Sequence, residues 1–318
     1  MSKTINVSSA PSRDANIVVI LPKSDPTNIL ILSIFRRVSQ KSGYRFTPYF
    51  VTPADRRTWP NPNRINNKTW LYLFGNLPSM PVHEANAHKI IKLASTETKS
   101  VVAVFWEFAF NSPIPDSDNL FRAFERVWSN SPDATDADWG LRAILRDMAL
   151  TAEQSNIGLA FRDADAMFTR PWDAQLAICK QRYNEDLAKL VAVVAGRSQY
   201  TLYVNEEVVA KCQLPAAWLG KVVRFVDTTD VEVDTGLLTR HVSQTHPDVG
   251  ILVQHRLHQL TNNVCHRYYC RAIKEVDLLA WDILAGHPRA ASGQVTHVVA
   301  PFSDHAWMES IDGMPFLA

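Results

Sequence analysis

The chain has few glycines and lacks the familiar glycine-containing motifs of nucleotide and ester chemistry. Only 11 of its 318 residues are glycine, which is few for a fold of this size that cradles a nucleotide with its backbone. No G-x-S-x-G, Walker A or G-x-G-x-x-G pattern is present. These absences argue against serine hydrolases of the nucleophile-elbow type, P-loop NTPases and Rossmann dinucleotide-binding enzymes.

Cysteine is also scarce. The four cysteines all lie in the C-terminal half, no two form a C-x-x-C, and no histidine pair stands at zinc-finger spacing from them. This pattern predicts small, buried, reduced side chains rather than a zinc site or a disulfide framework. It favours a reducing compartment, and we expect a cytoplasmic protein.

No charge of one sign dominates, and no long apolar run occurs. Lysine and arginine total 33 against 32 acidic residues, a net charge of +1. That balance argues against broad electrostatic binding to nucleic acid, although it allows a local basic groove. No apolar run reaches the roughly 18 residues of a membrane span, and the polar start of the sequence lacks a signal-peptide core. We expect no membrane association.

The first half of the chain alternates between strand and helix patterns. Short apolar runs without hairpin signals between them are typical of a parallel α/β sheet. From residue 119 to about 181 the apolar spacing becomes that of amphipathic helices. The predicted strands are Ile17–Leu21, Tyr44–Val51, Trp70–Phe74 and Val101–Phe105, with helices over Ile29–Arg37 and His83–Ser95.

The second half predicts a smaller mixed domain. A hairpin is expected from Tyr200–Val204 and Val208–Cys212, followed by further strands and helices. The predicted fold class is therefore α/β, with an N-terminal doubly wound parallel sheet and a second, smaller mixed α/β domain. The expected organisation is a flexible arm (1–15), a first domain (16–180), a linker helix (181–196), a second domain (197–300) and a C-terminal tail (301–318).

A glycine-containing turn near the C-terminus carries the most specific signal. Gly286 and His287 are followed by small residues and Gly293, so the backbone could approach a phosphate closely. Arg271 precedes this turn, and the stretch Val276-Asp277-Leu278-Leu279-Ala280 lies between them. The arrangement resembles the C-terminal domain associated with the DHH phosphoesterases. The resemblance implies that Arg271, Gly286, His287 and Gly293 contact a phosphate or nucleotide.

The same resemblance implies a two-metal centre, usually manganese, whose ligands this chain has largely lost. The first ligand block aligns with residues 22–28, where only Asp25 is acidic, and a strand-ending aspartate aligns with Gly75. The DHH triplet aligns with Trp106-Glu107-Phe108. The last aspartate aligns with Asp147, with Asp163 as the alternative. Asp25, Glu107 and Asp147 are thus vestigial candidates, sufficient at most for one weakly held Mg²⁺ or Mn²⁺ if the site survives.

Several other residues invite a functional interpretation. His83 and His88 stand five apart, which does not place them on one helix face for a shared metal, so we expect solvent-exposed histidines. Trp59, Trp218 and Trp307 have polar or proline-rich neighbours and are expected to be exposed. The basic 53–68 loop around Trp59 and the apolar C-terminal tail are the candidate contacts for a protein partner or stacked bases.

Three functions remain open from the sequence. The leading hypothesis is a catalytically inactive DHH-like protein that binds a nucleotide, a short single-stranded nucleic acid or a partner. A divergent metal-dependent phosphoesterase with a remodelled site is the first alternative. A structural subunit of a larger assembly, held through the 53–68 loop or the tail, is the second.

Overall fold

The computed structural model describes residues 11, 14–23, 25–52, 55–75, 77–78, 80–93, 118–128, 134–197, 199–212, 214–231, 233–259, 264–272, 289–291 and 295–301. The chain divides into two compact units, Met1–Asn184 and Glu185–Ala318. Each unit carries its own sheet, and each is described by itself.

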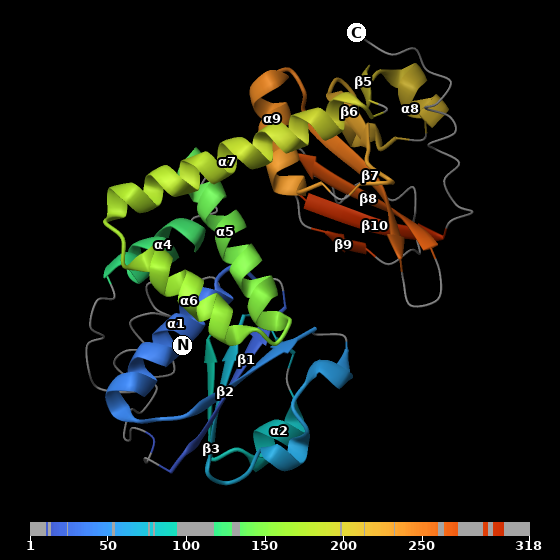
Figure 1. The fold of residues 1–318 in the computed structure, drawn as a ribbon. Coiled ribbons are helices and arrows are strands. Elements are labelled where there is room, and N and C mark those ends of the chain that lie inside the picture. The colour runs from blue at the N-terminus through green and yellow to red at the C-terminus, as the bar shows by residue number, and fades with distance from the viewer. Residues whose placement is uncertain are drawn as a thin grey trace, which may run out of the picture. The chain divides into compact units, whose positions relative to one another are not determined.

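The first unit is built on a parallel sheet of four strands (Figure 1). The spatial order is β2-β1-β3-β4, and every neighbouring pair runs parallel. The order reverses between β1 and β3, and in open parallel sheets ligands bind outside the carboxyl ends of the strands at such a switch point. The strands are β1 (Asn16–Pro22), β2 (Phe46–Val51), β3 (Thr69–Phe74) and β4 (Lys89–Leu93).

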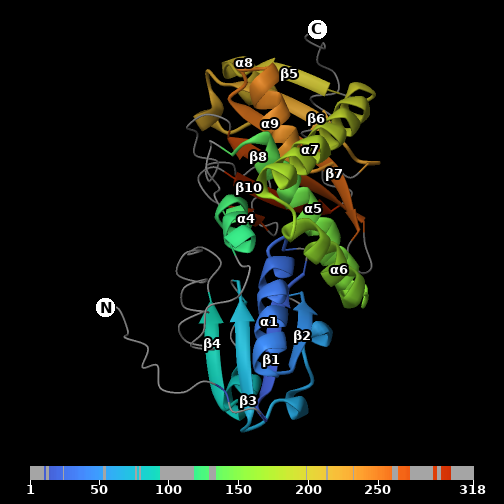
Figure 2. The ribbon, with the colours of Figure 1, turned by 60° about the vertical axis from the view of Figure 1, so that its left-hand side comes forward.

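Helices cover one face of this sheet. Alternate residues of β1, namely Ile17, Val19 and Leu21, pack into the core beneath them, as expected for a strand whose side chains point in turn to opposite faces. Figure 2 shows α1 running along the strands on this face, where it packs against the other three. The helices are α1 (Asn28–Ser42), α4 (Asp118–Trp128), α5 (Asp136–Glu153) and α6 (Ile157–Phe168).

Shorter elements cover the opposite face. The 3₁₀ turns η1 (Arg56–Thr58) and η2 (Pro62–Arg64) and the short helix α2 (Pro81–Asn86) lie on this side. The second core contains the other alternate residues of the strands together with side chains from these covering segments. Its members include Val18, Ile20, Trp59, Ile65, Leu71, Leu73 and Met80. The covering chain between β2 and β3 is therefore a packed layer.

Three expectations of exposure were wrong. Trp59 is 7% exposed, Trp218 is fully buried and His83 is 3% exposed. Polar and proline-rich neighbours in the sequence do not fix burial here, because the 55–65 segment folds back across the sheet and turns the Trp59 ring inward. Trp307 lies outside the described residues.

Two secondary-structure predictions were also wrong. The predicted helix His83–Ser95 ends as α2 at Asn86, and β4 begins at Lys89, where consecutive β-branched isoleucines suit a strand. The predicted strand Val208–Cys212 belongs to helix α8 (Glu206–Cys212), which begins with two glutamates after Asn205. The Asn205 side-chain oxygen accepts a hydrogen bond from the Val208 N–H at 2.9 Å, which caps this helix. The predicted strand Val101–Phe105 lies outside the described residues.

Helix α7 (Trp172–Ala195) is a continuous helix of 24 residues. The boundary between the two units falls within it, after Asn184. The predicted linker helix, residues 181–196, corresponds to its C-terminal part. Inside the first unit, Gly140 of α5 lies directly against the Cys179 carbonyl of this helix.

The second unit contains a mixed sheet of six strands in the order β5-β6-β7-β8-β10-β9. Strands β6 and β7 are parallel and are joined through α9 (Thr235–Thr245), which makes a βαβ unit, and every other pair is antiparallel. Together the two sheets confirm the predicted fold class. The strands are β5 (Gln199–Tyr203), β6 (Val222–Asp227), β7 (Ile251–Gln259), β8 (Val264–Ala272), β9 (Arg289–Ala291) and β10 (Val295–Pro301). A 3₁₀ turn, η3 (Ala216–Trp218), precedes β6.

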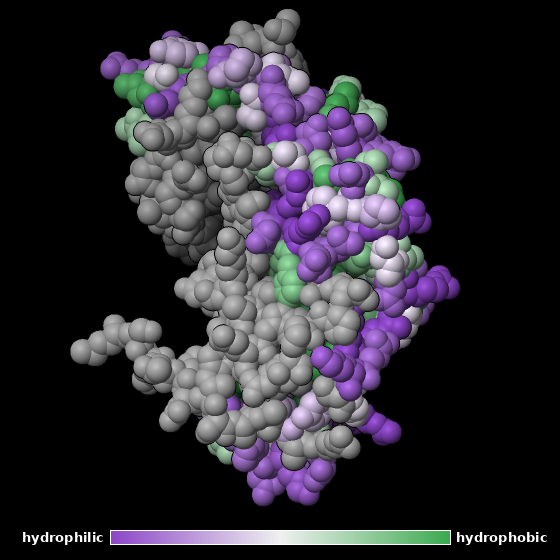
Figure 3. Space-filling view, turned by 90° about the vertical axis from the view of Figure 1, so that its left-hand side faces the viewer, coloured by the Kyte–Doolittle hydropathy of each residue, from purple (hydrophilic) through white to green (hydrophobic). Residues whose placement is uncertain are grey.

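On the face shown in Figure 3, the coloured residues are mainly hydrophilic, with small scattered hydrophobic areas. Among the helices that the structure describes, none has the length and apolar character to cross a membrane.

Cys179 is a buried free thiol, and burial raises its pKa to about 11, so it is a packing residue rather than a reactive one.

Candidate functional site

The carboxyl ends of β1 and β3 meet at the switch point of the first sheet. Pro22 ends β1, and Gly75 follows β3 with a φ of +74°. A Cβ placed on Gly75 would lie 3.2 Å from Cγ of Pro22, so the two residues pack closely. Neither offers a side-chain oxygen or nitrogen, although the resemblance aligns them with a histidine-containing block and a metal-binding aspartate.

Asp25 stabilises the start of helix α1. Its Oδ1 accepts hydrogen bonds from the Thr27 backbone N–H at 2.9 Å and from the Thr27 hydroxyl at 2.6 Å. Its carbonyl oxygen accepts from the Asn28 N–H at 3.1 Å. These bonds occupy donors that the first turn of a helix cannot satisfy internally. The carboxylate that survives in the first block therefore has a local structural role.

Asn28 is the buried polar side chain of this edge. It has no exposed surface, and its Nδ2 donates to the Pro22 carbonyl at 2.8 Å. That bond fixes which end of the amide is nitrogen. Its Oδ1 has no hydrogen-bond partner among the described residues. One neutral oxygen is a weak substitute for the carboxylates that a pair of divalent cations needs.

Asp147 lies on the exposed side of α5. Its Oδ2 is 2.7 Å from Nη1 of Arg182 on α7, and 52% of its side chain is exposed. The alternative candidate, Asp163 on α6, is 3.5 Å from its neighbour Arg162. No contact of the described structure joins Asp147 or Asp163 to Asp25. The structure therefore gives both candidates arginine partners rather than a common metal ligand set.

The residues that the structure describes at this edge do not fit a two-metal centre. Within the described ranges, no three histidine, cysteine, aspartate or glutamate side chains are gathered so that they could hold a metal ion. Glu107, with Trp106 and Phe108, lies outside those ranges. The placement of the triplet at 106–108 assumed that Val101–Phe105 was the next strand after Trp70–Phe74. In the structure β4 follows β3 in that position, which removes this support for the alignment.

The sequence-predicted phosphate contacts belong to the second unit. Arg271 lies on β8, where its backbone pairs with Leu252 of β7 on one side and Val295 of β10 on the other. Gly286, His287 and Gly293 lie outside the described residues. The segment between them, Arg289–Ala291, forms the edge strand β9 beside β10. The part of the motif that is described therefore lies in one sheet with Arg271.

A histidine–aspartate pair in the second unit was missed from the sequence. Asp227 at the end of β6 and His255 on β7 are register partners in the parallel pair, and Oδ1 of Asp227 is 3.4 Å from Nδ1 of His255. Burial alone would raise the pKa of Asp227, but the nearby His255 side chain and the hydrogen bond from the Thr229 N–H lower it below its usual value. No spacing rule indicates this pair, because its members are far apart in the sequence, with the whole of α9 between them.

Buried polar groups surround this pair. The Gln254 amide donates to the Thr228 hydroxyl at 2.9 Å and accepts from the Thr235 hydroxyl at 2.9 Å. Thr228 and Gln254 are 1% and 0% exposed. The network ties the end of β6 to the start of α9, whose first turn is capped by the Asp234 side chain. Such a satisfied network holds the carboxyl end of β6 against the middle of β7 in a fixed geometry.

No protein-family model and no curated protein sequence matches the chain. Solved structures do. A pGpG-specific phosphodiesterase, PggH from Vibrio cholerae, is similar over 94% of this chain and 97% of its own, with a TM-score of 0.51 and 14% identity. RecJ from Thermus thermophilus, solved with Mn²⁺, is similar over 95% of this chain and 52% of its own, with a TM-score of 0.45 and 9% identity. An exopolyphosphatase-related protein from Bacteroides fragilis is similar over 94% of this chain and 91% of its own, with a TM-score of 0.40 and 10% identity.

The first of these likenesses extends over nearly the whole of both chains. At 14% identity it shows the fold and not the chemistry of the site. It agrees with the resemblance that the Arg271 and Gly286–His287 elements indicated in the sequence. The chain therefore has the two-unit fold of the DHH phosphoesterases.

Proposed function

We propose that this chain is a DHH-fold protein that binds a nucleotide or a short single-stranded oligonucleotide and has lost two-metal hydrolysis. The observation that carries the proposal is the close packing of Pro22 and Gly75 at the switch point. The resemblance aligns Gly75 with a metal-binding aspartate and Pro22 with the start of a histidine-containing block, and here these positions carry a hydrogen atom and a ring. The ligand binds through the second unit and is released unchanged.

The small number of available carboxylates supports the proposed loss of the two metals. Two divalent cations held close together need several carboxylates to offset their repulsion and replace their waters. Of the described candidates, Asp25 holds the turn that leads into α1 through its hydrogen bonds from Thr27, and Asp147 pairs with Arg182. Recruiting either one to a metal would break an existing interaction, and the two residues beside the switch point would contribute nothing.

The anion side of the proposal rests on Arg271, Gly286, His287 and Gly293. An arginine guanidinium can hold a phosphate with two parallel hydrogen bonds, and backbone N–H groups beside glycine can approach it closely. The similar structure from Vibrio cholerae is described as specific for pGpG, so this linear dinucleotide is the first ligand to test. The proposal includes a reducing, cytoplasmic location, which the buried free thiol of Cys179 supports.

Calorimetric titration with pGpG tests the binding, and chromatography of the same mixtures tests the hydrolysis. We expect binding in EDTA and in Mn²⁺ alike, with no cleavage product. Arg271→Ala should weaken binding at least about tenfold, as expected for the loss of a charge-assisted contact. Arg267→Ala, an arginine of the same strand, is the matched control and should change the affinity little.

Two results would contradict the proposal in different ways. Mn²⁺-dependent cleavage that Asp25→Asn or Asp147→Asn abolishes would establish the divergent phosphoesterase instead. If pGpG and other short oligonucleotides neither bind nor raise the melting temperature, the ligand-binding function is wrong. A role as a subunit in an assembly would then be the better explanation.

A further inference from the structure

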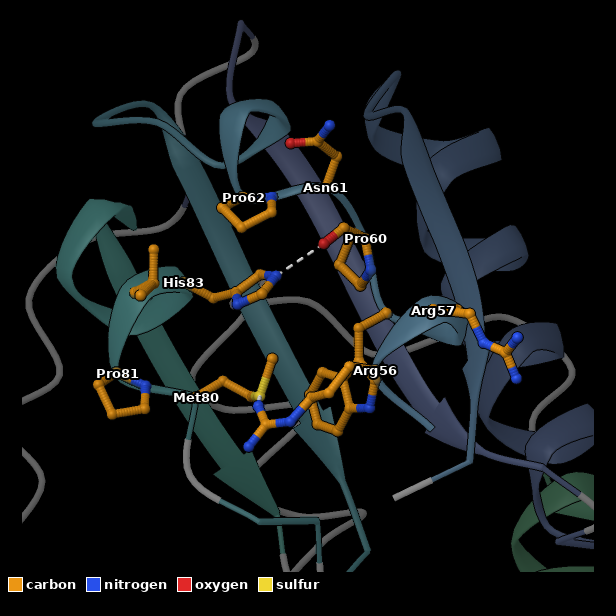
Figure 4. A pocket seen from close by; sticks show the side chains of 10 residues that line it. Arg56, Arg57, Pro60, Asn61, Pro62, Met80, Pro81 and His83 are labelled. Carbon is orange, nitrogen blue, oxygen red and sulfur yellow. Dashed lines mark hydrogen bonds between the residues drawn. The ribbon is translucent and has the colours of Figure 1, made fainter. Parts of the chain in front are cut away.

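A pocket of about 480 Å³ lies on the face of the first sheet opposite α1 (Figure 4). It is formed between the η1–η2 segment and the start of α2, and its apolar walls are Trp59, Pro60, Pro62, Met80 and Pro81. We call it the Trp59–His83 pocket. Its volume is in the range of pockets that bind small ligands. Rigid proline rings and an indole favour a flat apolar group against these walls.

His83 gives this pocket a buried hydrogen-bond acceptor. Its Nε2 lies 2.7 Å from the Pro60 carbonyl oxygen, and since a carbonyl can only accept, Nε2 carries the hydrogen. In the neutral ring, Nδ1 is then an acceptor. Nδ1 is buried and has no partner among the described residues, although the side chain lines the pocket. A buried acceptor without a donor is destabilising until a donor is supplied.

Arg56 gives the pocket a cation. Its guanidinium contacts the sulfur of Met80, a weak acceptor that does not neutralise it. No carboxylate of the described residues pairs with Arg56. Its neighbour Arg57 also lines the pocket, but it differs because its side chain is bonded to the carboxylate of Asp55 at 3.0 Å. The pocket therefore contains one charge without a counter-charge.

We propose that the Trp59–His83 pocket binds a small planar organic anion. The ring lies against the apolar walls, an N–H or O–H group donates to Nδ1 of His83, and a carboxylate or phosphate pairs with Arg56. Met80 lies between His83 and Arg56 in the close view (Figure 4), and its unbranched side chain can rotate aside to open the way to Nδ1. The pocket is on the sheet face and shares no residue with the proposed phosphate contacts, so this inference does not depend on the proposed function.

Two probes represent two classes of planar anion that also carry a hydrogen-bond donor, the nucleotides and the aromatic acids. Guanosine monophosphate has a base with N–H donors and a phosphate, and 4-hydroxybenzoate has a phenol and a carboxylate. Calorimetric titration of the full chain should show binding of at least one of them at submillimolar to millimolar concentration, and the stronger of the two identifies the class. Arg271→Ala should leave this binding unchanged, which separates it from the nucleotide site proposed above.

The adjacent arginines make a matched pair for testing the anion contact. Arg56→Ala should weaken binding of the probe at least about tenfold, since it removes a charge-assisted contact. Arg57→Ala removes the same charge one residue away and should change the affinity less than about threefold. Both side chains are exposed, so neither substitution should impair folding. Equal losses in the two variants would overturn the proposal, as would the absence of binding by both probes.

The donor contact is tested by changing the ligand and the protein together. The methyl ether of the phenol probe, 4-methoxybenzoate, lacks the donor and should bind the wild-type chain about fivefold more weakly. In His83→Phe the two benzoates should bind equally, because the acceptor is gone. A preference for the phenol that survives in His83→Phe would exclude Nδ1 as its partner. The melting temperature of this variant shows whether it folds, and the arginine pair tests the site even if it does not.

Discussion

Gly75 and Pro22 are in close contact across the two strands that meet at the switch point. Gly75 has a φ of +74°, and a Cβ on it would lie 3.2 Å from the Pro22 ring. The positive φ already disfavours any residue with a side chain. Parallel sheets bind their ligands at this edge. The two residues in contact here have no side-chain atom that can coordinate a metal. Replacing one residue alone would not rebuild a ligand set there.

The first prediction separates the backbone and contact effects at Gly75. Gly75→Ala should lower the free energy of unfolding by about 2 kcal/mol, combining a positive φ with the contact to Pro22. Gly43→Ala is the control, because Gly43 has a φ of +75° and nothing within 4 Å of its Cβ position. It should cost only about 1 kcal/mol. Urea unfolding measures both, and equal costs would mean that Pro22 yields without strain.

The second prediction concerns Asp25, which either holds the turn before α1 or serves as a metal ligand. If the turn is its role, Asp25→Ala should cost about 1 kcal/mol, the typical net value of a hydrogen bond, whereas Asp25→Asn keeps the accepting oxygen and should cost much less. Thermal unfolding with and without Mn²⁺ provides the second readout. An increase in melting temperature on adding Mn²⁺ that Asp25→Asn removes would show that the carboxylate still holds a metal.

Local patterns predicted the parts of the fold that local chemistry decides. The apolar runs Ile17–Leu21 and Trp70–Phe74 are strands β1 and β3, because buried parallel strands are apolar on both faces. The fold itself was indicated by the short stretch around Arg271 and Gly286–His287. That indication came from resemblance and not from periodicity, and the structural similarity confirmed it.

Non-local packing decided what the sequence did not predict. Trp59 is buried because its loop lies over β3, which no neighbouring residue indicates. The isoleucines Ile90 and Ile91 fit a helix or a strand equally well, and pairing with β3 makes them a strand. The contact between Asp227 and His255 requires the parallel register of β6 with β7. Each of these features depends on segments that are distant in the chain.

The third prediction tests the helix crossing in the first unit. A Cβ on Gly140 of α5 would lie 1.7 Å from the Cys179 carbonyl oxygen of α7, which is backbone and cannot rotate away. Gly140→Ala should therefore lower stability by at least about 3 kcal/mol, because the helices must separate. Gly158→Ala, on α6 with open space around it, should be neutral or stabilise by up to about 1 kcal/mol. Urea midpoints of the two variants provide the comparison, and similar shifts would contradict the crossing.

The last prediction concerns the pH dependence of the second unit. Burial alone would raise the pKa of Asp227, but the contact with His255 and the hydrogen bond from the Thr229 N–H hold it below the ordinary value of 3.8. A carboxyl whose pKa is lower in the folded state stabilises that state above its unfolded pKa, and the stabilisation is lost as the pH falls through the folded value. Asp227→Asn should therefore lower the melting temperature clearly at pH 6 and much less near pH 3.

A second variant assigns this effect to the pair. In a His255→Gln background one of the bonds that lower the pKa of Asp227 is absent, so Asp227→Asn should cost less at pH 6 than it does in the wild-type chain. The difference between the two backgrounds is the coupling energy of the pair. Melting curves of the four proteins at both pH values measure it. If Asp227→Asn costs the same in both backgrounds, the stabilisation comes from Thr229 and the capping network rather than from His255.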